Sequence, residues 1–156
     1  MLNLTISEFL GSLSHQVDLP IVAAGGSLKK VVRAMVKGHR RSIVYVVDSS
    51  GKLKGTISLS DLKDIIFRYY LDARVKDSLV VTEHIEELFS SENAEDVMDD
   101  CPISCHKHEK LHDVIVRMIE HDITHIPLID TEGRVISDLD ILDLLELWLK
   151  KGEEIF

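Results

Sequence analysis

The chain is poor in the features that mark secreted, membrane-spanning or nucleic-acid-binding proteins. Its 156 residues include two cysteines, too few for a disulfide framework. No apolar run approaches the ~20 residues that a membrane-spanning helix needs, and the N-terminus shows no signal-peptide pattern. Acidic residues outnumber basic ones by 27 to 18, and the formal charge of -9 argues against nonspecific binding to nucleic acid or anionic membrane. These absences predict a cytoplasmic protein.

Motifs of the common enzyme classes are missing as well. The sequence has no P-loop, no serine–histidine–aspartate arrangement tied to a nucleophile elbow, and no paired carboxylates on an evident cleft floor. Asp140 and Asp143 stand three residues apart at a predicted helix start, where carboxylates more often complement the helix dipole than perform acid–base chemistry. We therefore expect a protein that is not an enzyme.

What the sequence does contain is an internal repeat. Four landmarks recur 82 positions apart: Pro20 and Pro102, Asp48 and Asp130, Gly51 and Gly133, and Asp61 and Asp143. This period is too long for a solenoid unit and indicates a duplicated half-domain. We expect residues 1–75 to hold an N-terminal helix and the first repeat, and residues 76–156 a connector and the second repeat. Each half of roughly 75 residues would have a marginal core alone, so we expect one compact pair.

Hydrophobic periodicity and turn residues predict the same elements in each half: strand, helix, two strands, helix. An N-terminal helix starts at the capping-box spacing of Thr5 and Glu8. The first repeat reads as an extended piece at Val22, a helix over 28–37, strands 43–47 and 53–59, and a helix over 61–71. The connector contains an apolar run over 79–81 and a helix over 83–90 capped by Thr82. The second repeat reads as extended 103–105, a helix over 110–121, strands 125–129 and 135–139, and a final helix over 140–151.

The segment from Gly55 to Asp61 suits ligand binding. Glycine lets a ligand approach the backbone, and the hydroxyls of Ser58 and Ser60 can hydrogen-bond a phosphate or a sugar. The carboxylate of Asp61 can hold a pair of ribose hydroxyls. The alternative is that Ser60 or Asp61 only caps the following helix. Recurrence of the pattern downstream favours ligand binding.

In combination, three stretches make the chain resemble a tandem pair of cystathionine beta-synthase (CBS) domains, also called a Bateman module. They are 96–98 leading to 102–104, 124–130 with Gly133, and 55–61. The resemblance covers about residues 19–71 and 94–150. It implies an α+β fold of two β-α-β-β-α CBS repeats packed through their sheets with pseudo-twofold symmetry. It also implies inter-repeat clefts that commonly hold AMP, ADP, ATP or S-adenosylmethionine, as regulatory ligands rather than required cofactors.

The resemblance also implies roles for particular residues. Asp61 and Asp143 match the ribose-binding position, and Ser58 and Ser60 match the hydroxyls that hold phosphate. Gly55 and Thr56 belong to the same segment. The stretch before the second strand usually contacts adenine and phosphate, and it corresponds to Ser42, Ile43 and Val44 in repeat one and to Thr124, His125 and Ile126 in repeat two. The first extended segment, whose backbone often faces adenine, corresponds to Val22, Ala23, Ser104 and Cys105.

The second repeat departs from this pattern. Ser137 stands where repeat one has Gly55, and Asp140 stands where it has Ser58. A carboxylate at the phosphate position would repel an anionic ligand by about 1 kcal/mol or more when partly desolvated. The second cleft is therefore expected to be empty, to take adenosine without a phosphate contact, or to use a cation. Phosphate in the first cleft would need a positive charge from His39, Arg40, Arg41 or a partner subunit. The alternative is that these three residues form a solvated cluster that the dipole of the preceding helix favours.

A second constellation contains thiols and imidazoles, which are the usual ligands of zinc. Its members are Cys101, Cys105, His106, His108 and His112. The dense spacing suggests a metal site. Against this, the two cysteines flank a predicted strand and His112 begins a helix, so no two members clearly converge. The alternative is a loop with surface histidines and half-buried thiols.

We expect a stand-alone regulatory module that binds an adenosine-containing ligand near Asp61 and signals to an unknown effector protein in trans by conformational change. Pairs of this family usually form homodimers, and the helices containing 62–70 and 142–149 are the expected contact surfaces. One alternative is a dimerisation or interaction scaffold whose clefts no longer bind ligand. The other is a metal-responsive module. We expect neither a nucleic-acid nor a membrane partner.

Overall fold

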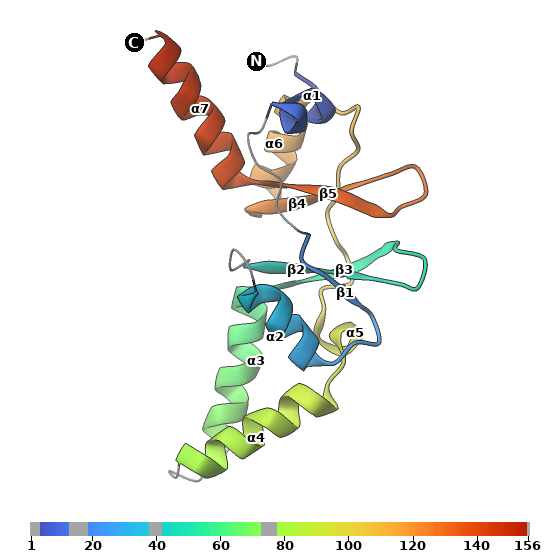
Figure 1. Cartoon of the computed structure of the whole chain (residues 1–156), viewed down its shortest axis with the longest axis vertical. Coiled ribbons are helices and arrows are strands. Elements are labelled where there is room, and N and C mark those ends of the chain that lie inside the picture. Colours follow the sequence, from blue (N-terminus) through green and yellow to red (C-terminus); the bar gives the residue numbers. More distant parts are fainter. Residues whose placement is uncertain (1–3, 13–18, 38–41, 73–77, 156) are drawn as a thin grey trace. The chain divides into compact units, whose positions relative to one another are not determined.

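The computed structural model describes residues 4–12, 19–37, 42–72 and 78–155, and the chain divides into two compact units (Figure 1). The repeat-one unit is Pro20–Pro102, and the repeat-two unit combines Met1–Leu19 with Ile103–Phe156. The fold class is α+β, as expected. The expected division at residue 75 differs from this grouping in two places, because the N-terminal helix belongs with the second repeat and the connector belongs with the first.

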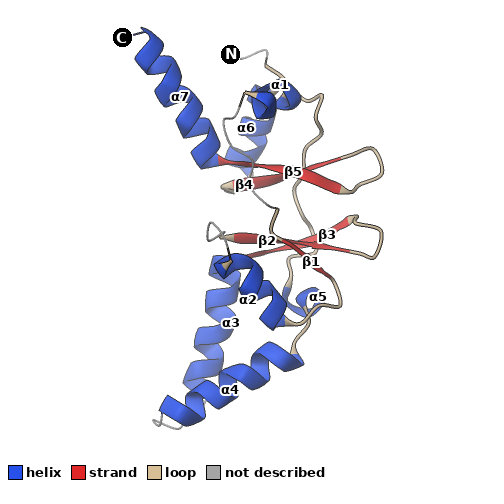
Figure 2. Cartoon of the chain, viewed as in Figure 1, coloured by secondary structure: helices blue, strands red, loops and turns tan. Residues whose placement is uncertain are grey.

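The repeat-one unit contains a three-stranded sheet in the order β1-β2-β3. Strand β1 (Ile21–Ala23) runs parallel to β2 (Ile43–Val47), which pairs antiparallel with β3 (Leu53–Ser58). Helices α2 (Leu28–Val36), α3 (Leu59–Asp72) and α4 (Ser78–Ser91) lie on one side of this sheet, and the short α5 (Ala94–Val97) contacts β3 (Figure 2). Helix α4 begins at Ser78, so Thr82 and the apolar run before it lie inside the helix rather than ahead of it.

The core of the repeat-one unit follows from the apolar stripe of α2. Leu28, Val31 and Met35 recur at helical spacing and are buried. They share one cluster with Val44, Val46 and Ile57 of the sheet, and with Leu62, Leu88 and Ala94 of the later helices. The connector helices α4 and α5 therefore belong to this core, which is why the unit extends to Pro102.

The repeat-two unit is built around a hairpin of β4 (His125–Ile129) and β5 (Val135–Asp140). Helices α1 (Ile6–Gly11), α6 (Leu111–Glu120) and α7 (Ile141–Ile155) complete it. The expected strand at 103–105 is reduced to one parallel bridge between Cys105 and Leu128. Ile6 and Phe9 of α1 are fully buried in the same cluster as Leu111, Val114 and Met118 of α6. Among the described residues, no helix is both long and apolar enough to cross a bilayer.

Helices α1 and α5 occupy equivalent positions on the two repeats. The amide of Leu28 donates to the carbonyl of Glu92 (2.8 Å), and the amide of Leu111 donates to that of Leu4 (2.7 Å). In return, the amide of Ala94 donates to the carbonyl of Gly26 (2.8 Å), and the amide of Ile6 donates to the carbonyl of Glu109 (2.9 Å). The helix that precedes each repeat in the sequence therefore closes the start of the core helix in the other repeat.

Gly55 in β3 is required by a close approach of the protein's own backbone. The amide of Thr56 donates to the carbonyl of Asp99 (3.0 Å), and the amide of Asp99 donates back to Thr56 (2.9 Å). A Cβ at position 55 would lie 2.5 Å from the Asp99 carbonyl oxygen and 2.6 Å from Sδ of Met98. The connector backbone therefore makes a close approach at Gly55 that a side chain there would block.

Replacing Gly55 with alanine should destabilise the protein by about 1–3 kcal/mol, because the new methyl group overlaps the connector backbone. Urea unfolding followed by circular dichroism measures this cost as a lower midpoint. Gly25→Ala is the matched control, since nothing lies within 4 Å of a Cβ there. Equal midpoints for the two variants would show that the connector does not hold this position.

Candidate ligand-binding site

The two predicted polar residues at the start of α3 form a capping box. The amide of Asp61 donates to Oγ of Ser58 (3.1 Å), and the amide of Ser58 donates to Oδ2 of Asp61 (3.3 Å). This pair satisfies one exposed N–H of the first helical turn and one of the preceding strand. The helix cap is thus Ser58 with Asp61, not Ser60, which stays exposed on the first turn.

Capping leaves these side chains able to bind a ligand. A carboxylate has about four lone-pair sites, and a hydroxyl that accepts one bond keeps its own proton to donate. Asp61 uses Oδ2 for the cap and is exposed, and Ser58 is half-buried beside it. The reciprocal bonds fix both side chains in one geometry, so the capping and ligand-binding interpretations are compatible.

The other predicted residues of repeat one lie on the strands that carry this junction. Ile43 is paired with Ser58 across β2 and β3, and the carbonyl of Ser42 accepts from the amide of Leu59 (2.7 Å). On β1, Val22 is buried in the core, whereas Ala23 is exposed. Thr56 is half-buried, and its backbone is committed to Asp99. Arg40 and Arg41 lie outside the described residues.

Repeat two has the same junction with different chemistry. The amide of Asp140 donates to Oδ2 of Asp143 (3.1 Å), and the amide of Leu142 donates to Oδ1 of Asp140 (2.8 Å). Nε2 of His125 lies 3.1 Å from Oδ2 of Asp140, and these two side chains are only 10% and 16% exposed. Oγ1 of Thr124 lies 2.9 Å from Nδ1 of His125. The predicted Thr124, His125 and Asp143 therefore meet around Asp140.

Asp140, where repeat two departs from the pattern of repeat one, has a side-chain partner that the sequence did not reveal. His125 is directly opposite Asp140 in the β4–β5 register, as Ile43 is opposite Ser58 in repeat one. An apolar–hydroxyl pair in the first repeat thus becomes an imidazole–carboxylate pair in the second. The Asp140 carboxylate contacts a histidine and a backbone amide, so it is not an isolated negative charge at the helix start.

The loop before α6 is held by a network that sequence reasoning missed. Nη1 of Arg117 donates to the carbonyl of Ser104 (2.9 Å) and to Oε2 of Glu109 (3.1 Å), and Nη2 donates to Oε1 of Glu109 (2.6 Å). Glu109 also accepts from the amide of His106 (2.8 Å). The hydrogen bonds from Arg117 and then from the His106 amide hold the pKa of Glu109 below its ordinary value. The one available signal was an arginine where the equivalent position of repeat one is Ala34.

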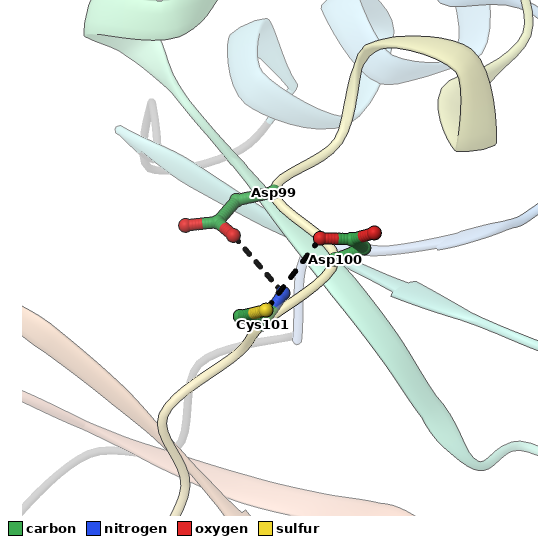
Figure 3. Close-up of side chains that lie close together, drawn as sticks. All are labelled: Asp99, Asp100 and Cys101. Atoms are coloured by element: carbon green, nitrogen blue, oxygen red, sulfur yellow. Dashed lines mark hydrogen bonds between the residues drawn. The ribbon is translucent and has the colours of Figure 1, made fainter.

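Within the described residues of the repeat-two unit, no three of Cys105, His106, His108 and His112 bring their ligand atoms together closely enough to hold a metal ion. Cys105 is fully buried, and burial raises the pKa of its thiol to about 12. The rings of His106 and His108 stack with their centroids 5.8 Å apart, and His112 is exposed at the start of α6. Cys101 belongs to the other unit, where its amide donates to Asp99 (3.0 Å) and its thiol to Asp100 (3.6 Å) (Figure 3). The bond to Asp100 raises the pKa of the Cys101 thiol.

Comparison with known proteins places this arrangement among CBS domains. The profile of the CBS domain matches residues 10–68 and 94–150. A similar structure is the CBS domain of a CBS domain-containing membrane protein from Sphaerobacter thermophilus, with 22% identity, a TM-score of 0.70 and coverage of 94% of this chain and 88% of that one. A search of curated proteins gives no match.

Two further similar structures contain adenosyl ligands. CBSX2 in complex with AMP is 18% identical, with a TM-score of 0.70 over 95% of this chain and 98% of that one. The CBS domain pair of protein MJ0100, in complex with 5'-methylthioadenosine and S-adenosylmethionine, is also 18% identical, with a TM-score of 0.66 and the same coverage. At this level of identity, the likeness establishes the fold.

Replacing Arg117 with methionine should destabilise the protein by about 1–3 kcal/mol at neutral pH, because Glu109 and the Ser104 carbonyl lose a charged donor. The folded-state pKa of Glu109 is lowered, so the stabilisation is present above the ordinary glutamate pKa and is lost as the pH falls through the folded value. The difference in free energy of unfolding between parent and variant should therefore shrink on acidification. Urea titrations at several pH values measure it.

The control for this experiment is Arg134→Met, which removes an exposed arginine paired with Glu132 in the hairpin turn of the same unit. Exposed ion pairs of this kind contribute little to stability, so Arg134→Met should lower the free energy of unfolding only slightly at every pH. A cost for Arg117→Met that stayed constant with pH would contradict the role assigned to Glu109.

Proposed function

The chain belongs to the CBS-domain family, and on that premise we propose that it is a regulatory module that binds an adenosine-containing ligand at the β3–α3 junction of repeat one. The observation that carries the proposal is the capping box of Ser58 and Asp61, which fixes a hydroxyl and a carboxylate side by side on an exposed edge. Asp61 would accept from the ribose hydroxyls. Ser58 and Ser60 would donate to phosphate.

The ligand class is supported by the two similar structures that hold adenosyl compounds, AMP in one and methylthioadenosine with S-adenosylmethionine in the other. Adenine would contact the backbone of β1 at Val22 and Ala23 and the start of β2 at Ser42 and Ile43. Gly55 and Thr56 would support this edge from β3, where the connector packs on them. Arg40 and Arg41, which follow α2 in the sequence, would supply the positive charge that phosphate needs.

Repeat two would bind a different part of the same ligand class. Asp143 repeats the ribose position, and Thr124, His125 and the backbone of Ser104 repeat the positions beside adenine. The Asp140 carboxylate replaces the hydroxyl of Ser58, so an anionic phosphate is disfavoured there. An adenosyl group without phosphate, or one that carries a positive charge, fits this junction better.

Binding would act on an effector protein in trans by shifting a conformational equilibrium. A ligand can shift such an equilibrium only by its difference in affinity for the two states. The junction residues are suited to this because each side chain serves a helix start as well as the ligand. A change at Ser58 or Asp61 would therefore reach α3 directly.

A second proposal, homodimerisation, is favoured by two exposed apolar helix faces. On α3 they are Leu59, Phe67, Tyr70 and Leu71, and on α7 they are Ile141, Leu142, Leu145, Trp148 and Leu149. Apolar side chains gathered on single faces mark interaction surfaces more often than scattered ones do. A dimer is compatible both with a ligand-binding module and with a ligand-free scaffold. A measurement of ligand binding is therefore needed to distinguish the two functions.

Asp61→Asn should weaken binding of the preferred ligand by about tenfold or more, because it removes the charge but keeps an oxygen that can cap the helix. A thermal-shift panel at about 1 mM AMP, ADP, ATP and S-adenosylmethionine identifies the ligand. A dissociation constant of about 10 µM would add roughly 2.7 kcal/mol of stability, which corresponds to about 5–10 °C. Calorimetry then gives the affinity of each variant.

Asp143→Asn is the matched control in repeat two, where it tests whether the second junction contributes. Unchanged affinity in Asp61→Asn would refute the assigned site. No shift with any adenosyl compound would favour the scaffold, and a shift with zinc alone would favour the metal-responsive alternative.

Leu142→Lys combined with Leu149→Lys should convert the dimer to a monomer at micromolar concentration, because both side chains are exposed on one face of α7. Sedimentation velocity measures the change, and circular dichroism checks that the fold is kept. Ile136→Lys is the control, since Ile136 is an exposed apolar residue on β5 rather than on α7. A parent protein that is already a monomer would rule out the dimer.

A further inference from the structure

Helix α2 carries an exposed basic face in a protein whose net charge is strongly negative. The basic side chains are Lys29, Lys30 and Arg33 of the helix and Lys37 at its C-cap, all exposed, and the helix contains no acidic residue. Their spacing of three, four and seven or eight residues places them on one side of the helix. Among the described residues, none of the four takes part in an ion pair.

The equivalent helix of repeat two, α6, has the opposite charge. The 83-residue offset that aligns Leu28 with Leu111 places His112, Asp113, Val116 and Glu120 at the positions of the four basic residues. Asp113 and Glu120 are exposed, and Asp122 follows them just beyond the helix. The one arginine of α6, Arg117, is already paired with Glu109. The outer face of α6 itself therefore carries acidic side chains, and the exposed Lys110 stands just before the helix.

Each of these two charged faces also presents an exposed apolar residue near the C-terminal end of its helix. Val36 of α2 is 57% exposed, and its equivalent Ile119 of α6 is 72% exposed. Val36 is followed by Lys37, the C-cap residue of α2, and Ile119 is followed by Glu120, the last residue of α6. The two faces therefore match in the position of their apolar contact and are complementary in charge.

We propose that the homodimer is head-to-tail, with α2 of one copy packed against α6 of the second copy. The proposal rests on the homodimer inferred above but not on any ligand. In a twofold-symmetric dimer of this kind, each contact of α2 with α6 occurs twice. Lys30, Arg33 and Lys37 then face Asp113 and Glu120, and Val36 meets Ile119.

A head-to-head dimer would bring identical helices together, so α2 would face α2 and α6 would face α6. Four basic side chains would then oppose four, and the acidic faces would also repel each other. Helices α3 and α7 do not discriminate between these arrangements, because their exposed charges are mixed. Lys63, Asp64 and Arg68 lie on α3, and Glu146 and Lys150 lie on α7. The charges of α2 and α6 therefore decide the orientation.

Cysteine cross-linking tests this orientation directly. The background is Cys101→Ser, which removes the exposed thiol, while Cys105 stays because it is buried. Val36→Cys and Ile119→Cys are prepared separately in this background and joined with a short bismaleimide. Each protein alone should give little covalent dimer. After subunit exchange in a mixture of the two, with one copy carrying a size tag, the tagged–untagged dimer should be the main cross-linked product.

Covalent dimer from either variant alone, without preference for the mixed species, would overturn the head-to-tail arrangement and leave the homodimer standing. A dimer in sedimentation that cross-links in neither condition would also overturn it. A monomer in sedimentation would refute the homodimer and this orientation together. Binding of adenosyl compounds is unaffected by any of these outcomes, so the ligand proposal is judged separately.

Charge reversal provides a second test. Lys30→Glu with Arg33→Glu should weaken the dimer by on the order of tenfold, because attractive contacts in both α2–α6 pairs become repulsive. Adding Asp113→Lys and Glu120→Lys to the same chain should restore it, since the complementary charges are exchanged. The parent dimer should also weaken as salt is raised. Equal dissociation constants for all three proteins would overturn the proposal.

Discussion

Helices α2 and α6 begin without a side-chain cap, and a carbonyl from a distant segment takes its place. The amide of Leu28 is satisfied by Glu92, and the amide of Leu111 by Leu4. Because an unpaired amide at a helix start is costly when buried, the segment that supplies each carbonyl, just before α5 or α1, is tied to the core it closes. The burial of Ile6, Phe9 and Ala94 follows from this arrangement. The two compact units are therefore not the two halves of the sequence.

The junctions between hairpin and last helix show how duplicated elements diverge. Both use a residue three positions into the helix to cap the chain, Asp61 in one repeat and Asp143 in the other. In repeat one the partner is a hydroxyl opposite an isoleucine, and in repeat two it is a carboxylate opposite a histidine. The hydrogen bond from the backbone to the aspartate is kept while the charge beside it is changed.

The sequence predicted what depends on short-range patterns. The stripes of α2 and α6, the paired strands and the turns at Gly51 and Gly133 were correct, and both turn glycines have positive φ. The start of α4 was placed too late, because an apolar run inside a helix resembles a strand over three residues. Contacts between residues far apart in sequence, such as α1 with α6 or Arg117 with Ser104, have no periodic signal and were not foreseen. At the candidate site, the capping pair was foreseen only in part, and the histidine opposite Asp140 emerged from the strand register.

The exchange of helices between repeats also sets an order for folding during synthesis. Pro20–Pro102 is a continuous stretch, so the repeat-one unit has all its residues once the connector has left the ribosome. Helix α1 is made before the repeat-one unit, yet its partners in α6 are made after it. Ile6 and Phe9 therefore remain without their packing partners Leu111, Val114 and Met118 until the repeat-one unit has been synthesised.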